Sequence, residues 1–182
     1  MNIIADALTL IRGIFVLFIL IIGVSWGRDA LPLVVILTIV CWLTDVLDGM
    51  LARKSGKPTQ LGNFDLVMDL GLAVSLAVCL AFWDIVPVAA FIAVILVVLI
   101  SELAFHFTAP RKFMMGLVYA GLLFAAWQIK PAWAWVILGG LAFLAFLAPK
   151  RFKVLVREFL GEVGSLFTEK DPDPSEKNFH FE

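Results

Sequence analysis

Six stretches of mostly apolar residues, separated by short polar connections, run along the chain. They lie near residues 7–26, 31–52, 64–83, 85–105, 113–129 and 131–148. A helix of about 20 apolar residues crosses a hydrocarbon core roughly 30 Å thick. Apolar and polar positions do not alternate with a period of two over many segments, as they would in a membrane barrel, so helices remain to satisfy the backbone in lipid. The pattern predicts an all-α integral membrane protein, a bundle of six transmembrane helices.

The composition supports a single membrane domain, which we assign to residues 1–149. The 182 residues are 62% hydrophobic and 16% charged, whereas soluble domains carry about 25% charged residues. The two cysteines, Cys41 and Cys79, lie inside apolar runs without CxxC spacing or a companion histidine. A disulfide framework or a zinc site therefore has no support.

Basic residues predict the orientation of the bundle. They cluster after the second, fourth and sixth stretches, as Arg53, Lys54 and Lys57, then Arg111 and Lys112, then Lys150, Arg151, Lys153 and Arg157. The other connections hold only Arg28 and Lys130. Because cytoplasmic loops carry the excess of Lys and Arg, we expect both termini and the loop after the second stretch to face the cytoplasm.

The last part of the chain is expected to lie outside the bundle. Residues 150–168 place apolar side chains at helical spacing with Lys and Arg between them. This pattern predicts a C-terminal amphipathic helix at the membrane interface or, alternatively, a helix packed against the membrane domain. Residues 169–182 are rich in charge and proline and are predicted to be a disordered tail.

Four aspartates border the second and third apolar stretches. Asp45 and Asp48 are three residues apart, and Asp65 and Asp69 are four apart, so each pair shares one face of a helix. An acid inside a membrane span costs roughly 2.5–3.5 kcal/mol on insertion scales and usually faces a bundle interior where it has a function. Because the connection is short, we expect a helical hairpin whose cytoplasmic ends bring both pairs into one pocket.

Four carboxylates in one pocket need compensating positive charge. Arg53 and the nearby lysines balance part of it, and divalent cations balance the rest. Carboxylate oxygens suit Mg²⁺, Mn²⁺ and Ca²⁺, and Mg²⁺ commonly completes its shell with phosphate oxygens. The residues predict a divalent-metal site that works on a phosphate-bearing substrate. A divalent-cation carrier is the competing hypothesis from a different functional class.

The acidic segment resembles the signature of the class I CDP-alcohol phosphatidyltransferase family. That signature reads D, two residues, DG, two residues, AR, eight residues, G, three residues, D, three residues, D, and the matching positions are Asp45, Asp48, Gly49, Ala52, Arg53, Gly62, Asp65 and Asp69. Only two residues separate Gly62 from Asp65, where the family has three. The stretch from Leu8 to Arg12 is also similar to the family's N-terminal region.

The resemblance implies a reaction that depends on two Mg²⁺ or Mn²⁺ ions. An acceptor hydroxyl attacks the β-phosphorus of CDP-diacylglycerol, and CMP is released. By resemblance, Asp45, Asp48 and Asp65 are metal ligands, and Asp69 completes the metal site or acts as the catalytic base. It also implies that Gly49 and Ala52 leave room for the cytidine and that Arg53 lies near the diphosphate. Members commonly form homodimers, so we expect one here.

The acceptor alcohol is less constrained by the sequence. Arg12, Arg111 and Lys112 are cationic and predicted near the cytoplasmic side, where they would hold a phosphorylated acceptor. The positive-inside rule alone would also place Arg111 and Lys112 there. Glycerol 3-phosphate is our first choice, and inositol phosphate, inositol and serine are alternatives. We expect a prokaryotic inner-membrane enzyme without a nucleic-acid partner, and an inactive relative that binds CDP-lipid is a further alternative.

Overall fold

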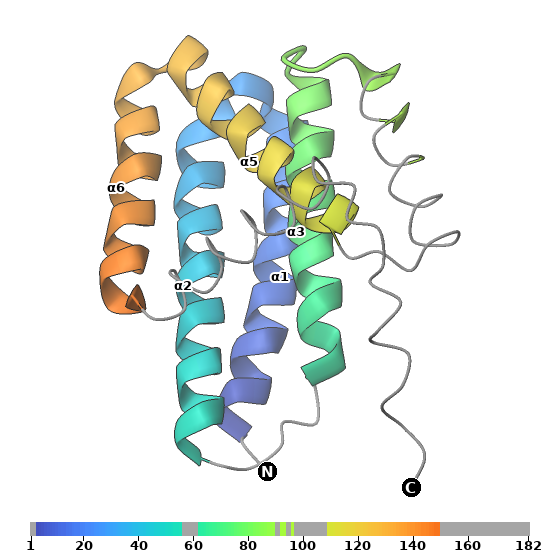
Figure 1. Ribbon diagram of the computed structural model, residues 1–182. Coiled ribbons are helices and arrows are strands. Elements are labelled where there is room, and N and C mark those ends of the chain that lie inside the picture. The colour runs from blue at the N-terminus through green and yellow to red at the C-terminus, as the bar shows by residue number, and fades with distance from the viewer. Residues whose placement is uncertain (1–2, 56–61, 90–91, 94–95, 97–108, 150–182) are drawn as a thin grey trace, which may run out of the picture. The chain divides into compact units, whose positions relative to one another are not determined.

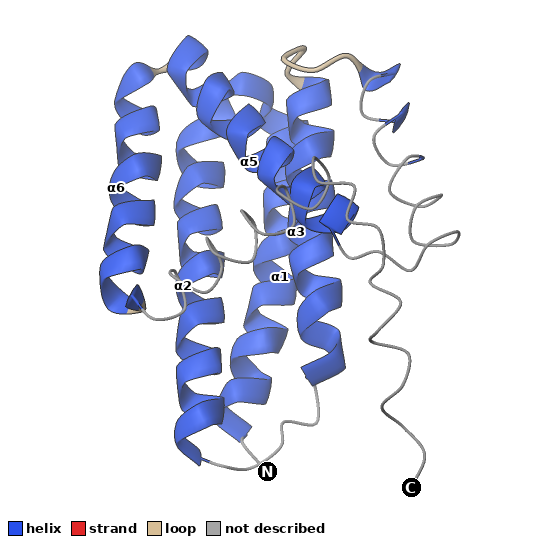
Figure 2. Ribbon diagram, viewed as in Figure 1, coloured by secondary structure: helices blue, strands red, loops and turns tan. Residues whose placement is uncertain are grey.

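The computed structural model describes residues 3–55, 62–89, 92–93, 96 and 109–149. Their elements are α1 (Ile3–Trp26), the 3-10 turn η1 (Gly27–Ala30), α2 (Leu31–Ser55), α3 (Gly62–Phe82), α5 (Ala109–Ile129) and α6 (Pro131–Leu147). Near the edges of these ranges, including 51–55, 62–66 and 109–113, only the backbone is described. Helices account for the secondary structure of the described ranges, with no strand among them (Figure 2). The predicted all-α fold is confirmed there.

The described helices follow the predicted spans, with two informative shifts. α2 continues three residues beyond the predicted end at 52, to Ser55, and α3 begins at Gly62 rather than at 64. The fourth predicted span, 85–105, lies mostly outside the described residues, so the six-span count stays a prediction. The predicted amphipathic helix at 150–168 and tail at 169–182 lie wholly outside them. Residues Met1–Ala148 form one compact unit, separate from Pro149–Glu182.

α1 is the central helix of the first unit. It packs against both α2 and α3, while α5 packs against α3 and α6, and α6 against α2 (Figure 1). The C-terminal end of α2 and the N-terminal end of α3 lie at the same end of the bundle (Figure 1). α2 and α3 therefore run in opposite directions with their near ends at one end of the bundle, as predicted, and α1 packs against both of them. The connection at residues 56–61 lies outside the described part.

The face of α1 that is turned inward follows a regular spacing. Its buried residues are Thr9, Arg12, Val16, Ile19 and Gly23, which recur every three or four positions and so form one stripe along a helix. The positions between them are apolar and exposed, for example Ile14, Leu17 and Ile21. The stripe thus places two polar side chains, Thr9 and Arg12, inside the bundle.

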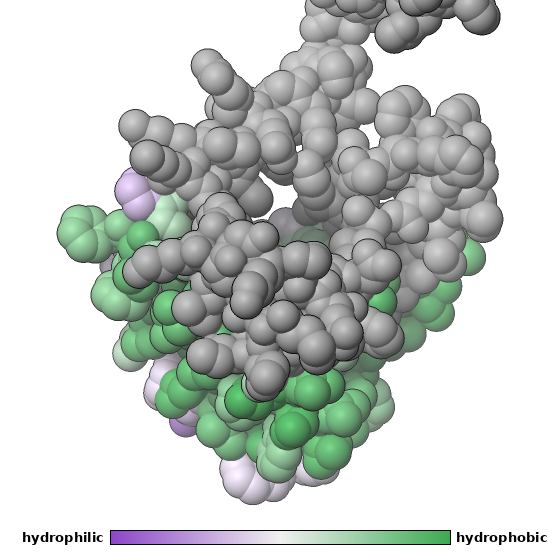
Figure 3. Space-filling view, turned by 90° about the horizontal axis from the view of Figure 1, so that it is seen from below, coloured by the Kyte–Doolittle hydropathy of each residue, from purple (hydrophilic) through white to green (hydrophobic). Residues whose placement is uncertain are grey.

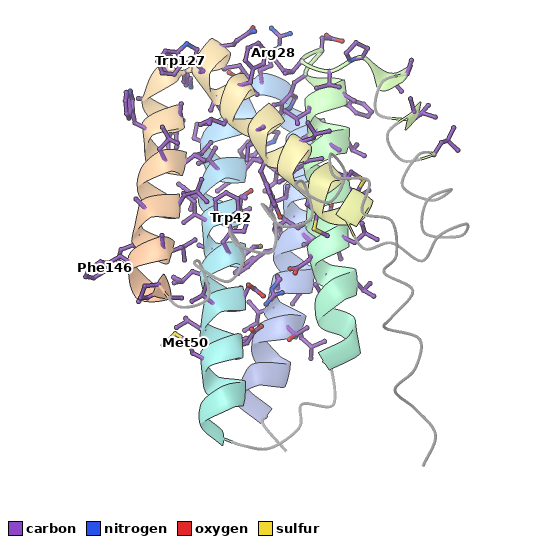
Figure 4. The ribbon with its side chains drawn as sticks, viewed as in Figure 1. Arg28, Trp42, Met50, Trp127 and Phe146 are labelled. Carbon is purple, nitrogen blue, oxygen red and sulfur yellow. The ribbon has the colours of Figure 1, made fainter. Side chains whose placement is uncertain are left out.

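Apolar side chains cover the outside of the bundle. Phe146 is 84% exposed and Trp135 is 65% exposed, and Phe146 points away from α6 while Trp42 points into the bundle (Figure 4). The described surface that is visible in Figure 3 is largely hydrophobic. Large exposed apolar surfaces are unusual for a protein in water, and the helical stretch Ala7–Met50 meets the length and hydropathy expected of membrane-crossing helices. The apolar helices indicate a membrane protein.

Glycine allows α1 and α3 to approach closely at the end of the bundle away from the aspartates. The Cys79 side chain of α3 occupies the space where a side chain at Gly23 would begin. Next to this contact, Trp83 donates its indole N–H to the Gly23 carbonyl at 3.0 Å, and Arg28 Nε donates to the Trp83 carbonyl at 2.7 Å. These contacts fix how α1 and α3 lie against each other and hence the register of their side chains.

Gly23→Ala is expected to destabilise the protein, because the added methyl group collides with Cys79. Overpacking of this kind costs about 1–3 kcal/mol, which should lower the melting temperature by several degrees in a thermal unfolding assay in detergent. Gly139→Ala on α6 is the matched control, since an added Cβ there meets nothing within 4 Å. Cys79→Ala should recover part of the loss in the Gly23→Ala background. A melting temperature in Gly23→Ala equal to that of Gly139→Ala would contradict the close approach.

Candidate functional site

A fully buried arginine lies at the centre of the predicted acidic site. Arg12 is 0% exposed and belongs to the inward stripe of α1. Its side chain meets carboxylates from both neighbouring helices, Asp45 and Asp48 of α2 and Asp69 of α3. We call these four residues the Arg12 cluster. The structure thus brings together three of the four aspartates that the sequence predicted to converge.

The two terminal nitrogens of Arg12 divide the carboxylates between them. Nη1 donates to Asp69 Oδ1 at 3.1 Å and lies 3.5 Å from Asp45 Oδ1. Nη2 forms a short ion pair with Asp48 Oδ2. A planar guanidinium offers several donors in a fixed arrangement, so it suits several carboxylates at once better than a lysine would. One side chain of α1 therefore links α2 to α3.

Helical spacing explains why these residues meet. Asp45 and Asp48 are separated by one helical turn near the end of α2, on the face that also carries the buried Cys41. Asp69 continues the inward face of α3 that includes the buried Leu72 and Leu76. Both faces are directed at α1, so the carboxylates reach the level of Arg12 from opposite sides. The register of three helices, rather than a loop, sets the geometry of the cluster.

Two buried threonines of α2 form hydrogen bonds within their own helix. Thr44 Oγ1 donates to the Cys41 carbonyl, and Thr38 Oγ1 donates to the Val34 carbonyl, each at 2.8 Å. Such bonds to the preceding turn are a common way for threonine to lie inside an apolar helix. These two side chains therefore complete the buried polar face of α2 without requiring a partner from α1.

The carboxylates of the Arg12 cluster differ in exposure. The side chain of Asp48 is 9% exposed, that of Asp45 is 23% exposed and that of Asp69 is 40% exposed. Asp48 on α2 is therefore the most buried carboxylate of the cluster, and Asp69 on α3 is the most accessible one.

The cluster has the donor chemistry that a divalent cation needs. All three carboxylates supply oxygen, the ligand that Mg²⁺ and Mn²⁺ prefer, and one guanidinium offsets only part of their charge. Asp45 and Asp69 present oxygens to the same nitrogen of Arg12, so a cation near that point would be within reach of both helices. Among the described side chains, no three His, Cys, Asp or Glu residues stand close enough together to ligate one ion. The donor types therefore suit a divalent cation, and the guanidinium of Arg12 occupies the point where the described carboxylates meet.

The other predicted site residues lie on the same helices. Gly49 is half-buried on α2 directly after Asp48. Ala52 and Arg53 follow on α2, and Asp65 lies on α3 one turn before Asp69. Arg111 and Lys112 are in the first turn of α5. The side chains of these five residues lie outside the described part. Gly62 is the first residue of α3. The missing residue between Gly62 and Asp65 is thus a difference within the first turn of a helix, and the spacing of Asp65 and Asp69 is unaffected.

The sequence did not reveal the part that Arg12 takes in the cluster. From the sequence we expected Arg12, together with Arg111 and Lys112, to bind the phosphorylated acceptor alcohol. We expected Arg53 and the nearby lysines to balance part of the negative charge of the aspartates. The structure places the Arg12 guanidinium among the aspartates themselves. The spacing of Thr9, Arg12, Val16, Ile19 and Gly23 was the available signal, because it puts Arg12 on the same stripe as the core residues of α1.

Comparison with known proteins identifies one family. No curated protein and no solved structure matches the chain. The family model described as CDP-alcohol phosphatidyltransferase matches residues 2–147, which include every member of the Arg12 cluster and the whole acidic signature. The resemblance that the signature indicated is confirmed over most of the chain's length, and the chain belongs to the CDP-alcohol phosphatidyltransferase family.

Proposed function

We propose that this protein transfers a phosphatidyl group from CDP-diacylglycerol to glycerol 3-phosphate, forming phosphatidylglycerol phosphate and CMP. Membership of the family supports an enzyme that transfers a phosphatidyl group from a CDP-alcohol. The observation that carries the proposal is that Asp45, Asp48 and Asp69, from two helices, all reach the buried guanidinium of Arg12 on a third helix. Acids inside a membrane bundle are costly, and such groups are usually retained for function.

Asp45, Asp48 and Asp65 are the proposed ligands of two divalent ions. The family is generally dependent on divalent metal, and the oxygen donors of the cluster agree with Mg²⁺ or Mn²⁺. When bound, such ions would polarise the phosphoryl group and stabilise the charge on the departing phosphate oxygen. Asp48, the deepest of the described carboxylates, would anchor the site, and Asp45 would share it with the substrate diphosphate.

Asp69 is the proposed base. It is the most exposed carboxylate of the cluster, so an acceptor hydroxyl has access to it. Asp69 takes the proton as the hydroxyl oxygen forms a bond to the β-phosphorus, and the bond from that phosphorus to the CMP oxygen breaks. CMP leaves with the bonding electron pair. Because Asp69 lies next to the proposed metal ligands, it would be close to the β-phosphorus of a substrate bound there.

The remaining residues are assigned by their places on the helices. Gly49 and Ala52 leave room for the cytidine, and Arg53 contacts the diphosphate. Arg111 and Lys112, at the start of α5, attract the phosphate of the acceptor. We further propose a homodimer in the inner membrane with both termini and the site on the cytoplasmic side, in agreement with the distribution of Lys and Arg.

Asp69→Asn is expected to lower CMP release at least about 100-fold, because general acid–base catalysis typically contributes 10²–10⁴-fold. The measurement is CMP formation by the purified protein with CDP-diacylglycerol, glycerol 3-phosphate and Mg²⁺. Asp84→Asn is the matched control, since Asp84 lies just beyond the other end of α3 at a positive φ of 54° that asparagine also tolerates. Full activity in Asp69→Asn would rule out its role as the base.

Removal of divalent metal is expected to abolish CMP release, and Mg²⁺ or Mn²⁺ should restore it. Asp48→Asn should raise the metal concentration needed for half-maximal activity, because it removes the deepest carboxylate. The measurement is a metal titration after treatment with EDTA. Metal flux into sealed vesicles without nucleotide would instead indicate a cation carrier. CDP binding without CMP production under every metal condition would indicate an inactive relative.

The acceptor is tested by comparing glycerol 3-phosphate, inositol phosphate, inositol and serine in the same CMP assay. We expect glycerol 3-phosphate to give the highest kcat/KM. Replacing Arg111 and Lys112 by glutamine should raise KM for that acceptor roughly tenfold or more, the effect of losing a charge-assisted hydrogen bond of about 1.5–3 kcal/mol, with little change in KM for CDP-diacylglycerol. Turnover of serine or inositol alone would overturn the choice of acceptor and leave the phosphatidyl transfer intact.

A further inference from the structure

We infer that Arg12 is a positioning residue for the metal site. Its guanidinium is a built-in counter-cation that holds the carboxylates of α2 and α3 together before metal binds, and the metal ions then take over the charge that it compensates. The inference rests on the proposed metal site, but its first consequence concerns the metal-free protein. Arg12 would thus allow the site to fold in the absence of metal. It would not take part in the chemical step.

The burial of Arg12 requires a compensating partner. Its side chain is 0% exposed, and a buried charge is tolerated only when other charges and hydrogen bonds replace its water. The three carboxylates meet that requirement, and removing Arg12 would take a positively charged partner away from each of them. Repulsion among Asp45, Asp48 and Asp69 would otherwise push α2 and α3 away from α1.

The same geometry argues against a role for Arg12 in binding the acceptor alcohol. Both terminal nitrogens are already directed at carboxylates, Nη2 at Asp48 and Nη1 at Asp45 and Asp69. To bind an acceptor phosphate, Arg12 would have to leave a buried position on the inward stripe of α1. Asp69, at 40% exposure, is the more accessible group. An acceptor would therefore approach Asp69 without direct contact with Arg12.

Arg12 and a metal ion draw on the same oxygens. Nη1 lies near Asp45 Oδ1 and Asp69 Oδ1, and Asp45 is one of the proposed ligands. Divalent ions at the cluster would compensate more charge than one guanidinium does. Loss of Arg12 should therefore harm the metal-free protein much more than the metal-bound protein. A residue with a purely structural packing role would show the same loss in both states.

The test compares melting temperatures of purified protein in EDTA and in saturating Mn²⁺. We expect Arg12→Gln to melt on the order of 10 °C below the unmodified protein in EDTA, as breaking a buried ion pair implies for a chain of this size. In Mn²⁺ most of that difference should disappear. Arg12→Lys, which keeps the charge but has fewer donors, should lose less in EDTA.

Arg28→Gln is the matched control, because Arg28 also has an intramolecular hydrogen bond, to the Trp83 carbonyl, but lies on η1 away from the aspartates. Its change in melting temperature should be the same with and without Mn²⁺. An Arg12→Gln loss that is equal in EDTA and Mn²⁺ would overturn the inference. An unchanged melting temperature with a raised KM for the acceptor would also overturn it and would return Arg12 to acceptor binding.

The double variant Arg12→Gln with Asp48→Asn provides a second test that needs no metal. Removing one carboxylate relieves the repulsion that the missing guanidinium leaves, so the double variant should melt above Arg12→Gln in EDTA. It also serves if Arg12→Gln alone cannot be purified. A double variant that melts below Arg12→Gln, or that also cannot be purified, would count against the inference. If the unmodified protein releases no CMP with any acceptor, the proposed function fails while these EDTA measurements still decide the role of Arg12.

Discussion

The ion-pair cluster around the buried guanidinium of Arg12 holds the three central helices together at the level of the site. α1 supplies the positive charge, and α2 and α3 supply the carboxylates on either side of it. Inside an apolar bundle a charged side chain is costly unless an opposite charge compensates it. The positions of Asp45, Asp48 and Asp69 are thus tied to the register of α1, and the site cannot be described from its acidic signature alone.

The rest of the bundle keeps that register. At the opposite end of α1, the close approach of Gly23 to Cys79 and the hydrogen bond from Trp83 fix α3 against α1. Between the two ends, apolar residues such as Ile19, Leu72 and Leu76 fill the interior. Membrane helices gain stability from close packing with small residues at their contacts rather than from exclusion of water. A glycine far from the site therefore contributes to where the carboxylates lie.

The uneven burial of the cluster connects the fold to the proposed chemistry. Asp48 is deep and tightly paired, whereas Asp69 is the most accessible member. The arrangement suits a site in which one end holds charge in place and the other meets a hydroxyl group. Both properties come from helix geometry, since Asp48 lies on the buried face of α2 whereas Asp69 lies on α3 at a more exposed position.

Much of this protein follows from its sequence alone. The lengths of the apolar stretches determine helices, because lipid requires every backbone group to be satisfied locally, and the spacing of the aspartates determines which share a helix face. The signature of those residues also indicated the family. Only the tertiary structure revealed the ion pairs that Arg12 forms with the aspartates. Which buried face of α1 meets α2 and α3, and at what height, depends on packing among residues far apart in the chain, and local spacing cannot specify that contact.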